Sequence, residues 1–393
     1  SSRIYTGLCS QNARVAKASD LVHPRTSHKM AFQLSDYQVG WISALAIEGT
    51  LAVAMLDVRH PRIPTPNDDN AYTFGQIHMD DESVHNVVIL CLGLGRTGKA
   101  STAAAAESMQ RTFPSLKFTL MVGIAGGVWS EDADVRLGDI VVGASGDGDA
   151  GVIQYDFGKT IRDRELVVTK RTMNKPPRVL LNAVSSIQAK HGSDDLGYLD
   201  FLEPRAIRRM APRPYDDYLF NRSYHHEDPR DRSCRECDTS ELRPRPRRSR
   251  SEQGIPKIHY GRIASGDQVM KSARIAEKIR RQYGILCFEM EAAGLDDFQF
   301  LAIRGISDYA DSHKNDEWHA YAAAAAAAYA KELLTVITST AVPVAPKDAK
   351  AQQEITRSHR AMHIGNVMDS ATAMYGDQTF SGVTNFGGTH NSR

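Results

Sequence analysis

Acidic residues that follow apolar segments are the groups best placed for chemistry in this chain. Residues 284–288 form an apolar run of strand length that leads to Glu289 and Glu291, and residues 300–307 form a second run that stops at Asp308. Ionised carboxylates are rarely buried unless they are paired or used. Because strand ends of an open α/β sheet border its ligand crevice, these acids should point into one site. From spacing alone, ordinary acids at helix N-termini are the alternative.

A glycine-rich turn at residues 93–99 is a second candidate site. Its sequence, Gly-Leu-Gly-Arg-Thr-Gly-Lys, almost matches a phosphate-binding loop, and it lies between a predicted strand and a predicted helix. The pattern then needs a Ser or Thr hydroxyl for magnesium, but Ala100 stands there and Ser101 comes one place late. A nucleotide triphosphatase is therefore the weaker hypothesis, although Arg96 or Lys99 could still hold a phosphate.

Cys234 and Cys237 form a single CxxC motif, with His225 and His226 upstream. These four residue types could bind zinc. However, one CxxC is only half of a usual zinc site, and adjacent histidines seldom share one metal ion. The sequence therefore favours no metal.

Apolar and helical segments alternate along the chain and would position these candidates. The pattern predicts strands at residues 39–45, 84–92, 118–124 and 139–143, and helices at residues 50–56, 100–111, 177–190 and 321–337. Strands that alternate with helices indicate an α/β fold with a largely parallel sheet.

Composition separates a folded core from three irregular segments. Residues 1–35 lack periodicity and are predicted to be a flexible N-terminal arm, ahead of a domain at residues 36–337. Within that domain, residues 191–257 are rich in Pro, Arg, Asp and Ser, which indicates an insertion that is looped out and partly disordered. Residues 338–393 form a linker and a polar tail, in which residues 378–388 are β-prone.

The overall composition restricts the class of protein. The chain has 393 residues, a formal net charge of +1 and five cysteines, which argues against a general nucleic-acid or membrane-surface binder and against a disulfide scaffold. No apolar stretch reaches the roughly 18 residues that span a bilayer, and the N-terminal segment lacks a signal-peptide core. A cytoplasmic protein with reduced cysteines is the simplest expectation.

Several motifs follow one another in an order that resembles a known family. They are Val-Gly-Trp-Ile-Ser-Ala at 39–44, Val-Gly-Ile-Ala-Gly-Gly at 122–127, Leu-Gly-Asp-Ile-Val-Val at 137–142, Ile-Ala-Ser-Gly-Asp at 263–267, Phe-Glu-Met-Glu-Ala-Ala at 288–293 and Arg-Gly-Ile-Ser-Asp at 304–308. Together they resemble the nucleoside phosphorylase superfamily, which includes purine nucleoside and uridine phosphorylases and methylthioadenosine/adenosylhomocysteine nucleosidases. The resemblance implies a three-layer α/β/α sandwich around a mixed, largely parallel sheet. Residues 152–159 and 308–313 look like the fungal members associated with NLR-type proteins in particular.

The resemblance implies a role for each principal candidate. Asp308 matches the aspartate that faces N7 of a purine and would protonate the departing base. Glu291 matches the glutamate that accepts hydrogen bonds from the ribose hydroxyls, and Met290 matches the methionine that packs under the sugar. Glu48 falls where nucleosidases carry their water-activating glutamate, and an anion there would repel phosphate. The alternatives are that Glu48 is a solvated acid in the first turn of a helix and that Met290 is a plain core residue.

Other residues would support these groups. Ser307 and Arg304 are expected to hold Asp308. The remaining residues expected around the substrate are Glu289, Ser265, Gly123, Ala125 and Gly126, and those that could hold phosphate are Gly98, Lys99 and Arg96. No metal or organic cofactor is expected, and inorganic phosphate would be a co-substrate only in phosphorolysis. The resemblance also implies a homo-oligomer.

The expected function is cleavage of the N-glycosidic bond of a purine nucleoside or thionucleoside, with hydrolysis favoured over phosphorolysis. The alternative is a ligand-sensing or scaffold module of a fungal NLR-like signalling system with little or no catalysis. The β-prone tail is similar to short amyloid-type signalling segments and would contact the partner in that case, although a plain disordered end explains it equally well.

Overall fold

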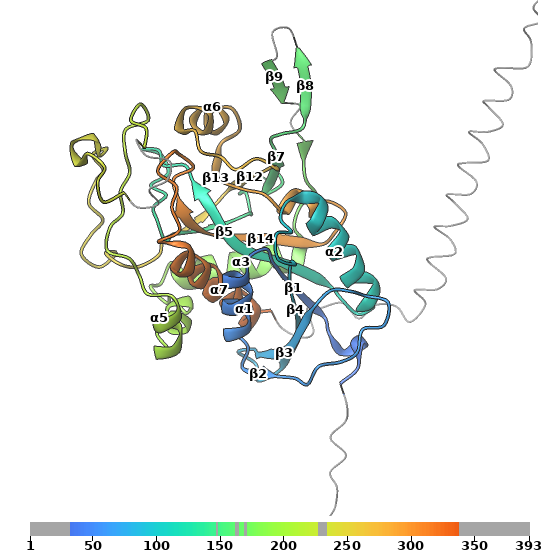
Figure 1. Cartoon of the computed structure of the whole chain (residues 1–393). Helices are drawn as coiled ribbons and strands as arrows, with labels where there is room; N and C mark the ends of the chain where they lie inside the picture. The colour runs from blue at the N-terminus through green and yellow to red at the C-terminus, as the bar shows by residue number, and fades with distance from the viewer. Residues whose placement is uncertain (1–31, 147, 162–164, 169–170, 227–233, 338–393) are drawn as a thin grey trace, which may run out of the picture.

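A mixed β-sheet forms the centre of the protein (Figure 1). The computed structural model describes residues 32–146, 148–161, 165–168, 171–226 and 234–337. The predicted tail and all but the last few residues of the predicted N-terminal arm therefore lie outside the described residues. The linker predicted from residue 338 onward lies outside them as well.

Twelve strands make up the main sheet of the described residues. They are β1 (Val39–Ser43), β2 (Val58–Arg59), β3 (Tyr72–His78), β4 (Val84–Cys91), β5 (Phe118–Gly127), β6 (Ile140–Val142), β7 (Val152–Gln154), β10 (Arg171–Thr172), β11 (Ile258–Tyr260), β12 (Arg262–Ser265), β13 (Ile285–Glu289) and β14 (Phe300–Asp308). A separate two-stranded hairpin of β8 (Gly158–Ile161) and β9 (Glu165–Val168) projects from the body of the molecule in Figure 1.

The helices of the described residues cover this sheet. They are α1 (Ala46–Ala54), α2 (Lys99–Thr112), α3 (Arg178–His191), α4 (Tyr198–Leu202), α5 (Arg205–Met210), α6 (Ala273–Tyr283) and α7 (His319–Thr335), with short 3₁₀ turns η1 (Leu34–Asp36), η3 (Thr239–Glu241) and η4 (Ala292–Leu295). In Figure 1, α1 and α7 lie on one side of the central strands and α2 lies on the other. No helix of the described part is both long and apolar enough to cross a membrane.

Alternating side chains of the strands divide the core between the two faces of the sheet. On one face, Trp41 and Val122 pack with residues of α1, α3 and α7. On the other face, Ile42 and Met121 pack with residues of α2. This period-2 alternation, with helices against both faces, gives the predicted three-layer α/β/α sandwich.

Close packing explains the alanine-rich sequence of α7. Residues 322–328 of this helix are alanines and all are buried. A methyl group built at Gly305 of β14 would lie 1.8 Å from the carbonyl oxygen of Ala322, so the two backbones touch. A helix with small side chains and a glycine opposite it permit this approach.

Strand β5 connects the two acidic strand ends that the sequence singles out. It pairs in parallel with β1 and β14, and its last two residues pair antiparallel with β13. The strands β13 and β14 do not pair with each other, since each of them pairs with β5. Since Gly126 is opposite both Phe288 and Asp308, the two strands lie along opposite edges of β5 and both end beside it.

The strands and helices predicted from periodicity are all present, with shifted ends. Strand β5 continues three residues beyond residue 124, because Gly126 and Gly127 pair with β13. Helix α1 begins at Ala46, four residues earlier than predicted, and the Glu48 carboxylate accepts the backbone amide hydrogen of Leu45 at its start. A tertiary pairing thus lengthens the strand, whereas a local capping contact fixes the start of the helix.

The described parts of residues 191–257 pack on the domain, whereas we expected a segment that loops out. Helix α4 contributes the buried Tyr198, which lies in the same core cluster as residues of α7. Further along, Arg248 forms an ion pair with the buried carboxylate of Asp139. Arg248 of this segment thus has a buried carboxylate partner in the domain.

Candidate active site

A cavity of about 180 Å³ lies at the ends of β5, β13 and β14. Of the residues expected from the sequence, those that line it are Glu48, Ala125, Gly126, Glu289, Met290, Glu291, Ser307 and Asp308. The acids that follow the two strands therefore face one cavity, together with the glutamate of α1. Tertiary structure brings these groups together from segments more than 200 residues apart in the chain.

Three backbone amides hold the carboxylate of Glu48 in the first turn of α1. Its Oε2 accepts hydrogen bonds from the amides of Ala44 and Leu45 at 2.8 and 2.9 Å, and Oε1 accepts one from Ile124 at 2.8 Å. Burial raises the pKa of Glu48, while Arg304 and these amides oppose the rise. Glu48 therefore lies in the first turn of a helix, as the alternative stated. It is buried and borders the cavity, whereas the alternative expected a solvated side chain. A carboxyl group whose pKa is raised in this way is a stronger base than an ordinary glutamate.

Arg304 is 1% exposed and binds the acids at the end of β13. Its guanidinium donates to the Glu289 carboxylate, and Nη2 lies 3.7 Å from Oε2 of Glu291. We expected Arg304 to hold Asp308, and that expectation is wrong. Arg304 lies four residues before Asp308, which is about 13 Å along an extended strand. Its guanidinium therefore lies beside the end of β13 and not beside Asp308.

The carboxylate of Glu289 also fixes the backbone that presents Glu291. Its Oε2 accepts hydrogen bonds from the amides of Glu291 and Ala292 at 3.0 and 2.9 Å. The Glu291 carboxylate in turn accepts one from the amide of Gly98 at 3.3 Å. Glu289 thus borders the cavity mainly as a support for its neighbour.

The electrostatic environment makes Glu291 harder to ionise than an ordinary glutamate. Burial is the largest cause and raises its pKa to about 7; the cation of Arg304 opposes the rise, whereas nearby Glu289 and Glu48 add to it. Three carboxylates around a single guanidinium cannot all be neutralised by it. Near neutral pH, Glu291 therefore exchanges between its neutral and ionised forms.

Asp308 is held by its neighbour in β14 and by groups of the loop that follows. Its Oδ1 accepts the amide hydrogen of Ala310 at 2.9 Å, and Oδ2 accepts the hydroxyl hydrogen of Ser307 at 3.0 Å and pairs with the ammonium group of Lys314. The expected contact between Ser307 and Asp308 is thus present. A methyl group built at Gly126 would lie 2.6 Å from Oδ1 of Asp308, so only glycine leaves room for the carboxylate there.

Sequence reasoning missed several residues that line the cavity. Lys314 and His319 face it, as does the loop that contains Gln268, Val269 and Met270. Burial lowers the pKa of His319, which favours a neutral ring. The motif that carried the resemblance to fungal members, residues 308–313, ends one residue before Lys314, and the loop around it has no periodicity that could mark a functional side chain.

Two of the expected residues support the site without lining the cavity. Ser265 is fully buried, and its hydroxyl accepts the amide hydrogen of Ala293 at 2.9 Å, next to the turn that follows Glu291. A methyl group built at Gly123 would lie 2.5 Å from Oε1 of Glu48. Both residues therefore position the acids.

The predicted phosphate-binding residues face carboxylates. The ammonium group of Lys99 lies 2.6 Å from Asp156 and 3.3 Å from Asp267, and its backbone amide donates to Asp267 at 3.0 Å. The amide of Gly98 already donates to Glu291, and Arg96 lies on the exposed part of the turn. A phosphate would have to compete with these anions for the same donors.

Other concave regions are larger but lack this chemistry. One of about 980 Å³ is lined chiefly by basic side chains, and its one acid, Glu277, forms ion pairs with Arg222, Arg280 and Arg281. The smaller cavity is the candidate active site because the carboxyl groups of Glu48, Glu291 and Asp308 meet there. Away from it, His226, Cys234 and Cys237 are the group of possible metal ligands found among the described residues.

Comparisons with known proteins identify the family to which the chain belongs. The family model described as the Phosphorylase superfamily matches residues 49–340. A nucleotide-binding leucine-rich repeat (NLR)-like protein of Hyaloscypha variabilis is 42% identical over 316 residues, which is 78% of this chain but only 30% of that relative's length. A 5'-methylthioadenosine/S-adenosylhomocysteine nucleosidase of Mycobacterium bovis is 25% identical over 261 residues, covering 64% of this chain and 81% of that protein.

Among solved structures, the futalosine hydrolase of Helicobacter pylori matches 76% of this chain and 97% of its own, with 16% identity and a TM-score of 0.48.

Proposed function

Because the chain belongs to the Phosphorylase superfamily, we propose that it hydrolyses the N-glycosidic bond of a purine nucleoside or thionucleoside. The observation that carries the proposal is the convergence of Glu48, Glu291 and Asp308 on one cavity. The similarity to a nucleosidase of Mycobacterium bovis supports the same reaction.

The three acids divide the work of the reaction. Glu291 accepts hydrogen bonds from the sugar hydroxyls, since a carboxylate offers two acceptor oxygens to a diol. Glu48 takes a proton from the water whose oxygen bonds to the anomeric carbon. As the bond between that carbon and the base nitrogen breaks, the Asp308–Lys314 pair supplies a proton to the departing base. A water molecule is thereby added across the broken bond.

The charges around the cavity favour water over phosphate as the nucleophile. Glu48 borders the cavity as a buried carboxyl group, and a phosphate next to its anion would be repelled. The nearby cation of Lys99 is engaged by Asp156 and Asp267. Phosphorolysis would require these contacts to rearrange.

Substrate binding requires the cavity to widen. Most ligand pockets measure roughly 300–1,000 Å³, whereas this one measures about 180 Å³. Gln268 and Val269 line it and are exposed, so outward movement of their loop is the simplest way to admit a nucleoside.

Base release with and without phosphate tests the proposal. The purified chain is incubated with adenosine, inosine or methylthioadenosine, and free base and sugar are quantified by chromatography. We expect release without phosphate, with the free sugar as product. Glu48→Gln should abolish release, while Glu107→Gln on the exposed face of α2 serves as the matched control. Strict dependence on phosphate, with a sugar phosphate as product, would overturn the hydrolytic assignment.

A second candidate function rests on the similarity to the NLR-like protein of Hyaloscypha variabilis. In this case the domain binds a nucleoside and passes the signal to a partner with little or no turnover. Calorimetry that shows nucleoside binding without base release would favour this function. The tail, which lies outside the described residues, would then be tested for fibrils with a cross-β dye. The absence of both fibrils and templating would count against a signalling tail.

A further inference from the structure

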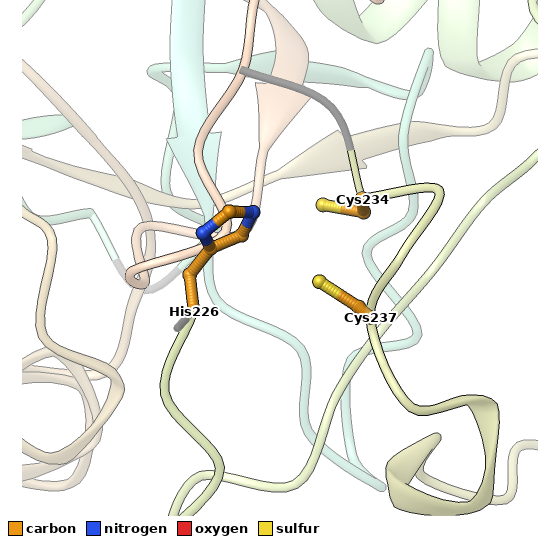
Figure 2. Close-up of side chains that lie close together, drawn as sticks. All are labelled: His226, Cys234 and Cys237. Atoms are coloured by element: carbon orange, nitrogen blue, oxygen red, sulfur yellow. The ribbon is translucent and has the colours of Figure 1, made fainter. Parts of the chain in front are cut away.

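Three metal-ligating side chains converge outside the catalytic cavity. The ligand atoms of His226, Cys234 and Cys237 all lie within 4.8 Å of one another. Figure 2 shows both sulfur atoms directed toward the imidazole ring of His226. Thiolate sulfur and imidazole nitrogen are the ligands that Zn²⁺ prefers in proteins. The sequence alone favoured no metal, because one CxxC is half of a usual zinc site and adjacent histidines seldom share one ion.

Local backbone contacts hold these residues in place. The amide of Cys237 donates to the carbonyl of Cys234 at 3.3 Å, which closes the CxxC segment into a turn. The amide of His226 donates to the hydroxyl of Ser312 at 3.0 Å. The side-chain amide of Asn315 lies 3.6 Å from the sulfur of Cys234. The group is therefore attached to the loop that follows Asp308.

His313 is placed to complete the group. Its ring centroid lies 5.5 Å from that of His226, and its carbonyl lies 3.6 Å from the sulfur of Cys234. The side chain is more than nine-tenths buried, and neither ring nitrogen has a hydrogen-bond partner within the described part of the chain, although Nδ1 lies 3.7 Å from an Asp311 oxygen. Buried imidazole nitrogens normally have a partner, so these point to a ligand.

We propose that His226, Cys234 and Cys237 bind Zn²⁺, with His313 as the fourth ligand. A closed set of four protein ligands is typical of a structural zinc site. Zinc requires bond lengths of about 2.0–2.3 Å, so the four side chains would move closer together around the ion. The ion would join the inserted segment to the loop at residues 308–315.

The zinc would act on the active site through this loop. Cys234 and His313 line a small cavity of about 30 Å³ whose other walls include Ser307 and Asp308. Lys314, which pairs with Asp308, is the next residue after His313. The metal would thus fix the position of the Asp308–Lys314 pair. This effect on turnover rests on the proposed function, whereas zinc binding itself does not.

Metal analysis of the full chain tests zinc binding directly. The protein is expressed with zinc in the medium, passed over a desalting column and analysed by plasma mass spectrometry, with thiols counted in parallel. We expect about one zinc per chain. His226→Ala should lower zinc affinity by at least about tenfold, while His225→Ala, which removes the exposed neighbouring histidine, should retain the metal.

Further readouts keep the test decisive if a variant does not fold. Cobalt added to the metal-stripped wild-type chain should give the sulfur-to-cobalt charge-transfer absorption of thiolate ligands, and a chelator should lower the melting temperature reversibly. A chain without zinc, with unchanged melting in chelator, would overturn the proposal, as would a Cys234–Cys237 disulfide detected by mass spectrometry. Zinc binding unaffected by His313→Ala would overturn the assignment of the fourth ligand.

Discussion

Replacing Glu291 by glutamine should stabilise the protein at neutral and alkaline pH. The amide has nearly the same size as the carboxyl group but cannot ionise. Glu291 is 6% exposed and shares the guanidinium of Arg304 with Glu289. The wild-type protein must therefore bury a poorly compensated charge whenever Glu291 loses its proton.

The size and sign of the effect follow from the pKa of Glu291. It is raised from 4.5 to about 7 in the folded protein, and each tenfold change in ionisation is worth about 1.4 kcal/mol. This difference corresponds to roughly 3 kcal/mol of unfolding free energy. Because the folded pKa is the higher one, the protonated Glu291 carboxyl group contributes its full stabilisation of the wild-type fold below about pH 4.5. This contribution is lost as pH rises through about 7. Glu291→Gln should not show this loss.

Urea unfolding from about pH 5 to about pH 8 measures the difference. The gap in unfolding free energy between Glu291→Gln and wild type should grow in favour of glutamine by roughly 2–3 kcal/mol over this range. Glu107→Gln on the surface of α2 is the control and should follow the wild-type curve. Parallel curves for wild type and Glu291→Gln would refute the reasoning, because they would mean that the buried carboxyl group titrates as if exposed.

Three further substitutions test other parts of the site. Asp308→Asn should lower kcat for base release roughly 10²–10⁴-fold with little change in KM, as a lost proton donor predicts, and full turnover in a steady-state assay would exclude Asp308 from that role. Lys314→Ala should lower kcat by roughly 10²-fold, and Lys314→Arg should restore part of it by keeping a cation beside Asp308; equal kcat in both variants would count against a charge effect. Arg304→Met leaves the buried Glu289 and Glu291 without their cation and should cost about 3–5 kcal/mol in urea unfolding; a loss under about 1 kcal/mol would contradict the ion-pair assignment.

The principal candidates could be predicted because each lies in a short segment with its own pattern. Glu48, Glu291 and Asp308 all follow apolar runs that fold into strands of one sheet, and the carboxyl ends of such strands share an edge. Met290, Ala125 and Gly126 were placed by the same motifs, and they also line the cavity. Their roles as substrate ligands remain proposals.

The neighbours of these residues could not be predicted in the same way. Arg304 was assigned to Asp308 from closeness in sequence, but the pairing of β5 with both β13 and β14 brings it to Glu289. Lys314 lies in a loop without periodicity, and its contact with Asp308 depends on how that loop turns.

By itself, the sequence determined the α/β class, the order of the elements and the three acids that surround the cavity. Only the tertiary structure decided which cation each acid meets, that the arginine-rich insertion packs on the domain, and that His226 rather than His225 joins the two cysteines. The physical reason is that hydrophobic periodicity records which face of an element is buried. Ion pairs and metal ligands join side chains from irregular loops, and their positions are fixed only when the whole chain is packed.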